Sequence, residues 1–195
     1  NEQTRLLKAV KVAIKNPTKK VILPTDGLPA KSFEKIAVET SFKFPQYKQA
    51  NVKRLWKKAE INNFMSLVRA ILEIEAPLSE ELLLKELIKV YFQRENVTDY
   101  VRQDYMNEMH NYSHYGIIRK KGFLYLNDST RKIQFRGPGD ITRDVSQIAP
   151  EELAAGMLAI LQQNVSADKN GLYHSLALQC GISRVSQSVI DCFNS

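Results

Sequence analysis

The sequence has little of several features, and each shortage narrows the class of protein. Its 195 residues contain no apolar run near the roughly 20 residues that a membrane-spanning helix needs, so we expect no contact with a membrane. Only two cysteines occur, Cys180 and Cys192, and in a cytoplasmic chain they would stay reduced and pack as small apolar side chains. The remaining composition, 44% hydrophobic and 25% charged, is typical of an ordinary globular protein.

Motifs for catalysis are also missing. The sequence has no G-x-x-x-x-G-K-[ST] loop for a nucleoside triphosphate and no G-x-S-x-G turn for a nucleophilic serine. His110 and His114 have the four-residue spacing of two metal ligands, but no third ligand is evident, and a polar helix end is the simpler interpretation. We therefore predict no enzyme activity in this chain, no cofactor, no metal and no small-molecule substrate.

Acidic residues are scarce in the first third of the chain. Residues 1–58 contain 14 Lys and Arg against 4 Asp and Glu, a net charge of +10, whereas residues 59–195 have a net charge of −3. The overall charge of +7 therefore belongs to the N-terminal third. A high isoelectric point alone does not make the rest of the chain a nucleic-acid binder.

Two stretches of the chain repeat one another. At an offset of 89 residues, Ala70-Ile71-Leu72 recurs as Ala159-Ile160-Leu161, and Leu83 and Leu87 recur as Leu172 and Leu176. Allowing one deletion, Val97, Val101 and Tyr105 recur as Val185, Val189 and Phe193. The repeat predicts two related structural modules, at about 62–127 and 150–195.

Each module has the pattern of three short amphipathic helices. In module one we expect them at 64–73, from a Ser79 cap to about Tyr91, and at 98–112, followed by a basic β-hairpin over 117–126. Three helices and a hairpin describe a winged helix, which mostly binds nucleic acid and otherwise binds protein. Module two has helices at about 151–163, 172–180 and 184–193, and the chain stops where its wing would follow, so we expect a piece of a longer protein.

The predicted fold is therefore mainly α with a small β-hairpin. It consists of tandem winged-helix-like (helix-turn-helix) modules, the second lacking its wing, joined by a linker at 128–149. Residues 1–61 form a basic N-terminal α(+β) subdomain, with helices at 4–15 and 30–40 and a short strand at 21–23.

Several strings resemble one bacterial family. Residues 69–78 resemble its "VEGP(I/V)" opening, 81–87 its leucine-rich second helix, Gly122-Phe123-Leu124-Tyr125 its "GDFLW" wing, and 148–155 the "IPPEEIA" start of its second unit. The family is an uncharacterised winged-helix-like domain near the C-terminus of very large superfamily-1 DNA helicases, often beside a nuclease-like module. The resemblance covers about 62–195. It implies an accessory region of an ATP-dependent DNA helicase that holds DNA or positions the motor.

The charge pattern decides where DNA would bind. The third helix of module one has Arg102 against Asp99, Asp104 and Glu108, so phosphates would repel it. The wing and linker are basic, and the candidate contacts there are Arg119, Lys120, Lys121, Arg131, Lys132 and Arg136. We expect phosphate contacts with little sequence information, and solvated loop charges are the alternative interpretation.

A second candidate lies in the N-terminal third, where lysines and aromatic residues alternate. Lys53, Arg54, Lys57 and Lys58 could clamp a nucleic-acid backbone, with Phe44, Tyr47 and Trp56 stacking on bases. Because aromatic residues are usually buried, we favour a core role for the rings. The predicted function is thus non-catalytic, non-sequence-specific DNA binding within a larger protein. The alternatives are a protein-interaction module that docks the rest of the parent polypeptide or another partner, and a structural spacer between motor and nuclease.

Overall fold

The computed structural model describes residues 43–128, 130–163 and 168–194. In this part of the chain the structure is mostly helical with a small antiparallel sheet of three strands, which confirms the predicted class at that level. The helices predicted at 4–15 and 30–40 and the strand at 21–23 lie outside the described residues. None of the described helices is both long enough and apolar enough to cross a membrane.

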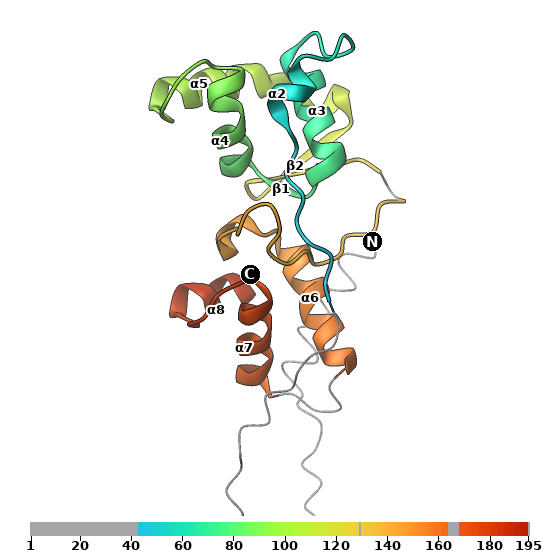
Figure 1. Cartoon of the computed structure of the whole chain (residues 1–195), viewed down its shortest axis with the longest axis vertical. Coiled ribbons are helices and arrows are strands. Elements are labelled where there is room, and N and C mark those ends of the chain that lie inside the picture. Colours follow the sequence, from blue (N-terminus) through green and yellow to red (C-terminus); the bar gives the residue numbers. More distant parts are fainter. Residues whose placement is uncertain (1–42, 129, 164–167, 195) are drawn as a thin grey trace, which may run out of the picture.

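The elements form two bodies stacked along the long axis (Figure 1). The upper body contains α2 (Val52–Trp56), α3 (Phe64–Glu75), β1 (Leu78–Ser79), α4 (Glu80–Val90), α5 (Asp99–Glu108), the 3-10 helix η1 (Met109–Tyr115), β2 (Ile117–Lys120) and β3 (Phe123–Leu126). The lower body contains the 3-10 helix η2 (Val145–Gln147), α6 (Pro150–Gln163), α7 (Lys169–Gln179) and α8 (Gln187–Asn194). The upper body contains predicted module one together with α2, and the lower body contains predicted module two together with η2.

Side-chain caps set the starts of the helices in module one. Asn63 accepts a hydrogen bond from the backbone N–H of Ser66 at 2.8 Å, and Ser79 accepts one from Leu82 at 3.4 Å. Each cap satisfies a backbone donor that the first turn of a helix leaves free. The predicted Ser79 cap of α4 is therefore confirmed, and Asn63 caps α3.

The predicted hairpin is present, and it belongs to a larger sheet than the sequence indicates. Lys121 and Gly122 form the two-residue turn with φ of 51° and 76°, the left-handed geometry that suits a tight hairpin. The short strand β1, which was not predicted, pairs antiparallel with β3 through Leu78 and Leu124. The strand order is β1-β3-β2, so β3 lies in the centre.

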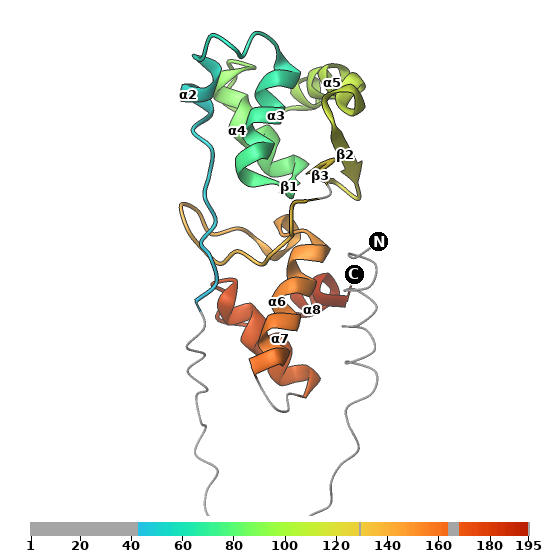
Figure 2. The same ribbon diagram turned by 90° about the vertical axis from the view of Figure 1, so that its right-hand side faces the viewer.

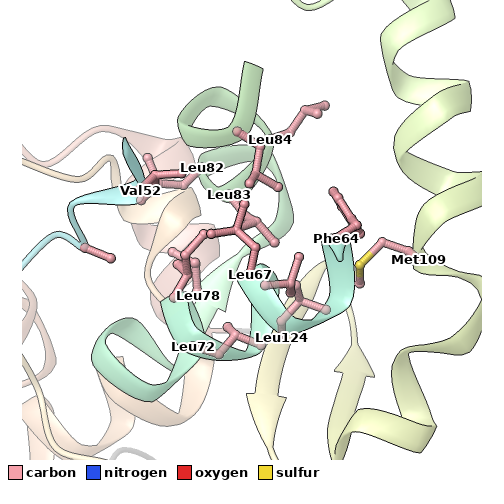
Figure 3. Packing of buried hydrophobic residues seen from close by; sticks show 14 of the residues in the cluster. Val52, Phe64, Leu67, Leu72, Leu78, Leu82, Leu83, Leu84, Met109 and Leu124 are labelled. Carbon is pink, nitrogen blue, oxygen red and sulfur yellow. The ribbon is translucent and has the colours of Figure 1, made fainter. Parts of the chain in front are cut away.

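Module one closes on an aliphatic core between α3, α4, η1 and β3 (Figure 3). Leu67, Leu83, Leu87 and Leu124 are fully buried there. Burying such a side chain contributes roughly 1.5–3 kcal/mol. The sheet is thereby held against one side of the helices.

Module two is a three-helix body with its own core. The repeated positions on the second helices have equivalent environments in both modules: Leu172 and Leu176 are as buried on α7 as Leu83 and Leu87 are on α4. At the third helices, Tyr105 and Phe193 are 4% and 7% exposed. The sequence repeat therefore reflects equivalent core positions at these sites, whereas Leu161 and Val189 are only half-buried where Leu72 and Val101 are buried. Of the cysteines, Cys180 is buried and Cys192 is half-buried.

Residues 43–61, predicted as part of an N-terminal subdomain, share the cores of both modules. Tyr47, Val52 and Leu55 belong to the core of module one, while Phe44 packs edge-on against Phe135 at 4.8 Å in module two. Figure 2 shows this segment running from α2 alongside both bodies. We call residues 44–50 the strap, because they connect the two modules.

Residues 130–149, which the sequence presents as a linker, also carry buried side chains. Phe135, Val145 and Ile148 lie in the core of module two, and Ala149 packs with Phe123 and Tyr125 of the wing. The strap pairs with this segment, since the backbone N–H of Tyr47 donates to the carbonyl of Gly137 at 2.9 Å. The two modules are thus joined by extended chain on both sides.

Candidate nucleic-acid interface

Two of the three cations predicted to contact DNA from the wing are paired with carboxylates. Arg119 Nε lies 2.7 Å from Glu80 Oε1, within module one. Lys120 Nζ lies 2.7 Å from Glu151 Oε1, at the start of α6 in the other module. Lys121, in the hairpin turn, is exposed and makes no ion pair with another described residue. The wing therefore has one cation without an internal partner in the described part of the chain.

Glu151 is a buried carboxylate shared by both strands of the wing. Its other oxygen accepts a hydrogen bond from Tyr125 at 2.6 Å. Burial alone would raise the pKa of Glu151, but the hydrogen bonds from Lys120 and Tyr125 outweigh it and hold that pKa below its usual value. Lys120 thus joins the modules, although half of its side chain is exposed.

A cation of the linker is also bound to other groups of the protein. Arg131 donates to the carbonyls of Leu72 and Glu73 at the end of α3, at 3.2 and 3.1 Å. Cations near the last carbonyls of a helix stabilise its negative end. Lys132 is exposed and has no ion-pair partner among the described residues.

Among the predicted DNA contacts, Arg136 is the one most fully bonded to other groups of the protein. Its guanidinium donates to Glu152 Oε2 at 2.8 Å and to the carbonyls of Glu75 and Pro77 at 2.7 and 2.9 Å. Only 12% of its side chain is exposed. A nucleic-acid phosphate could reach this group only by displacing bonds that join the two modules.

Glu152 also binds a second arginine of the basic linker, Arg143. Arg143 Nη2 lies 2.7 Å from Glu152 Oε1, and both side chains are almost fully buried. Burial raises the pKa of Glu152, but the hydrogen bonds and charges of Arg136 and Arg143 overcome this and hold it below its usual value. In the sequence, the adjacent Glu151 and Glu152 could have indicated this carboxylate site. Acidic residues are also favoured in the first turn of any helix, which explains the pair equally well.

The basic residues in and around α2 differ from those of the wing in having no carboxylate partner among the described residues. Residues 43–58 contain six basic residues and no acidic one: Lys43, Lys48, Lys53, Arg54, Lys57 and Lys58. All six are exposed, and none is ion-paired with another described residue. Lys53 and Arg54 lie on α2, and Lys57 and Lys58 follow directly after its last residue, Trp56. We call residues 43–58 the basic segment.

The aromatic rings of the basic segment hold it in place. Tyr47 is 1% exposed, and Trp56 packs edge-on against Tyr91 with ring centroids 5.4 Å apart. Phe44 is half-buried against Phe135. The favoured interpretation of these rings as core residues is confirmed. The segment thus presents its cations from an anchored backbone.

Helix α5, which the winged-helix hypothesis predicts to be the recognition helix, keeps the acidic character seen in the sequence. Asp99, Asp104 and Glu108 lie on it against a single arginine, Arg102. Its exposed apolar side chains are Tyr100, 67% exposed, and Met106, 42% exposed. The net negative charge of this helix would repel phosphates.

A hollow of about 560 Å³ opens between the end of α3, the wing and the linker. Ile74 and Ile118, which contribute to its wall, are 43% and 44% exposed. Arg131, Lys132 and Asp128 lie around it. Its lining combines exposed aliphatic side chains with charge.

The described residues contain no group of three or more His, Cys, Asp or Glu side chains placed to hold a metal. The chain matches no protein-family model, no curated protein and no solved structure. Interpretation of the site therefore depends on the geometry and chemistry of its own residues.

Proposed function

We propose that this chain is a non-catalytic module that binds the phosphate backbone of nucleic acid through the basic segment. The single observation that carries the proposal is the set of six exposed cations over residues 43–58, a stretch that contains no acidic residue and makes no ion pair with the other described residues. Such a surface attracts phosphates through charge and releases their counterions. The two modules hold this segment rigidly rather than contacting bases.

We also infer that module one is a winged helix. The order helix, short strand, two helices and hairpin, with the sheet order β1-β3-β2, supports this assignment. In a winged helix that binds DNA in the usual way, the third helix enters the major groove. The acidic charge of α5 argues against that mode here, so base-specific readout is not part of the proposal.

The wing contributes less than the sequence suggests. Arg119, Lys120 and Arg136 are bound to carboxylates, which leaves Lys121 and Lys132 as the predicted wing and linker cations without an ion pair or carbonyl partner in the described structure. These two residues offer an accessory contact. If the helicase resemblance holds, such a module would keep DNA beside the motor without performing chemistry.

The proposal is tested by fluorescence anisotropy with duplex, forked and single-stranded DNA at several salt concentrations. Binding through the basic segment should weaken by about 0.9 log unit per tenfold salt for each duplex phosphate neutralised. The variant Lys53→Glu/Lys57→Glu should lose most of the affinity and lower the salt slope. The matched control Lys121→Glu/Lys132→Glu changes the charge equally and should have a smaller effect. Equal loss in both variants, or no binding to any DNA at low salt, would refute the assignment.

A second candidate, protein docking, is favoured by the hollow beside the wing and by the exposed Tyr100 and Met106 on α5. Such a surface would bind through burial of apolar area and would depend little on salt. Selection of a randomised peptide library on the immobilised chain separates the two functions. Enrichment that disappears with Ile118→Asp but survives Lys53→Glu/Lys57→Glu would favour docking, whereas no enrichment would count against it.

A further inference from the structure

Two carboxyl groups, one fully buried and one partly buried, hold the strap against module one. Glu75, at the end of α3, is fully buried and accepts hydrogen bonds from the Tyr47 hydroxyl and, at 2.7 Å, from the backbone N–H of Ala50. Glu86, on α4, accepts a hydrogen bond from the Gln49 side-chain amide at 2.9 Å. Three groups of residues 47–50 therefore depend on two carboxyl groups from two helices.

The two carboxyl groups also contact each other. The side chains of Glu75 and Glu86 lie within hydrogen-bonding reach of each other, although both are acids. The second oxygen of Glu86, Oε2, is buried and accepts no hydrogen bond from the described residues. A buried carboxylate oxygen without a donor is costly, whereas a protonated carboxyl can donate to a facing carboxylate.

Nearby cations do not neutralise the two facing carboxyl groups, because these cations are already paired with another carboxylate. Arg136 and Arg143 lie over the Tyr47 ring at 5.0 and 4.1 Å, but both donate to Glu152. Five charged or titratable groups surround Glu75 and Glu86: Tyr47, Asp140, Arg136, Arg143 and Glu152. Tyr47 belongs to the strap, and Asp140 accepts a hydrogen bond from the backbone N–H of Gln49 at 2.9 Å. The other three lie at the junction between the modules.

We propose that Glu75 and Glu86 share one proton and so form a latch for residues 47–50, tight in mildly acidic solution and looser toward mildly alkaline solution. The proton lies between the two carboxyl groups, and the ionised member accepts the Tyr47 and Ala50 donors. When the proton is lost, two adjacent negative charges remain under the strap. Since the strap leads directly into α2, the latch controls how firmly the basic segment is anchored.

The electrostatics of the cluster agree with this geometry. Burial, and then the charge of Glu75, raise the pKa of Glu86 to about 8 from its ordinary value of 4.5. Burial also raises the pKa of Glu75. Because the latched state binds the proton more tightly than the released state, opening becomes easier as pH rises from about 4.5 to 8 and changes little above that.

Hydrogen exchange of the Ala50 backbone amide, measured by NMR on the whole chain, tests the latch. In the wild type its protection factor should fall at least about tenfold between pH 5.5 and 7.5. In Glu86→Gln, whose amide can both donate to Glu75 and accept from Gln49, protection should stay constant across this range. The Cys180 amide, which donates to Leu176 in module two, serves as the internal control and should not change with the substitution.

The same pH dependence at Ala50 in both proteins would overturn the proposal. A carbon-13 titration of the Glu86 carboxyl in the wild type gives an independent check that needs no variant. A midpoint near 8 supports the shared proton, and a midpoint near the ordinary 4.5 refutes it.

Discussion

The basic residues of the wing and linker and those of the basic segment look alike in the sequence but lie in different settings. Lys120, Arg136 and Arg143 point into the junction between the modules, where Glu151 and Glu152 bind them. Lys53 and Lys57 are exposed and have no internal ion pair in the described structure. A cation that stabilises the fold and a cation available to a ligand are thus distinguished only by where the acidic residues lie in space.

The largest expected effect comes from breaking the junction. Glu152→Ala leaves Arg136 and Arg143 buried without their carboxylate, and uncompensated buried charge typically costs about 3–5 kcal/mol. Urea unfolding should show a loss of that size. Lys132→Ala, an exposed linker control, should change the free energy of unfolding by less than about 0.5 kcal/mol. A small effect of Glu152→Ala would mean that these arginines are not structural.

The acid pair beneath the strap gives the next effect, and this one depends on pH. The pKa of Glu86 is raised in the folded protein to about 8, so the folded state binds more protons than the unfolded state between its ordinary value of 4.5 and 8. The wild-type stability should therefore fall as pH rises through that window. Glu86→Gln should remove the slope and be more stable by roughly 1–2 kcal/mol at pH 8. Urea midpoints at pH 5 and pH 8 measure the difference, and parallel pH profiles for the two proteins would contradict it.

A smaller loss of stability is expected at the Lys120–Glu151 pair, where the Lys120 side chain is half exposed. Lys120→Ala removes one partner of Glu151, but Tyr125 still donates to that carboxylate. Because the Lys120 side chain is 51% exposed, solvent screens the pair and the loss should be about 1 kcal/mol or less. The unfolding free energy of Lys120→Ala should also be less sensitive to salt than that of the wild type. A loss as large as that of Glu152→Ala would place Lys120 with the buried arginines.

The smallest stability effect belongs to the basic segment. Lys53→Ala/Lys57→Ala removes two exposed side chains without internal ion pairs among the described residues, so the change should stay within about 0.5 kcal/mol. Thermal unfolding, with the sole tryptophan, Trp56, as the fluorescent reporter, follows this region directly. A marked destabilisation would show that these lysines contribute to folding.

Local features of the fold could be predicted because neighbouring residues determine them. The caps at Asn63 and Ser79, the proline at the start of α6 and the tight turn at Lys121-Gly122 are all visible in short stretches of sequence. The repeat also placed Leu172 and Leu176 in a core because their counterparts, Leu83 and Leu87, follow a helical period. The strand β1 was missed because two residues carry no alternation pattern.

The pairing of charges could not be predicted, because it depends on contacts between modules. Lys120 and Glu151 are 31 residues apart, and Arg136 and Glu152 are 16 apart. In the sequence the acidic pair at the start of α6 is explained by the helix dipole alone, and the linker cations by exposure to solvent. Only the packing of the wing on module two shows that these residues neutralise each other.

The most direct test of the account measures DNA affinity and folding stability together for two variants, Lys53→Ala/Lys57→Ala and Arg136→Ala. The account predicts opposite outcomes: the double lysine variant should lose DNA affinity and keep its unfolding midpoint, while Arg136→Ala should lose stability and, where it remains folded, keep its affinity. If Arg136→Ala lost affinity while its stability was unchanged, or the lysine variant bound DNA as the wild type does, the division between structural and ligand-binding cations would be wrong.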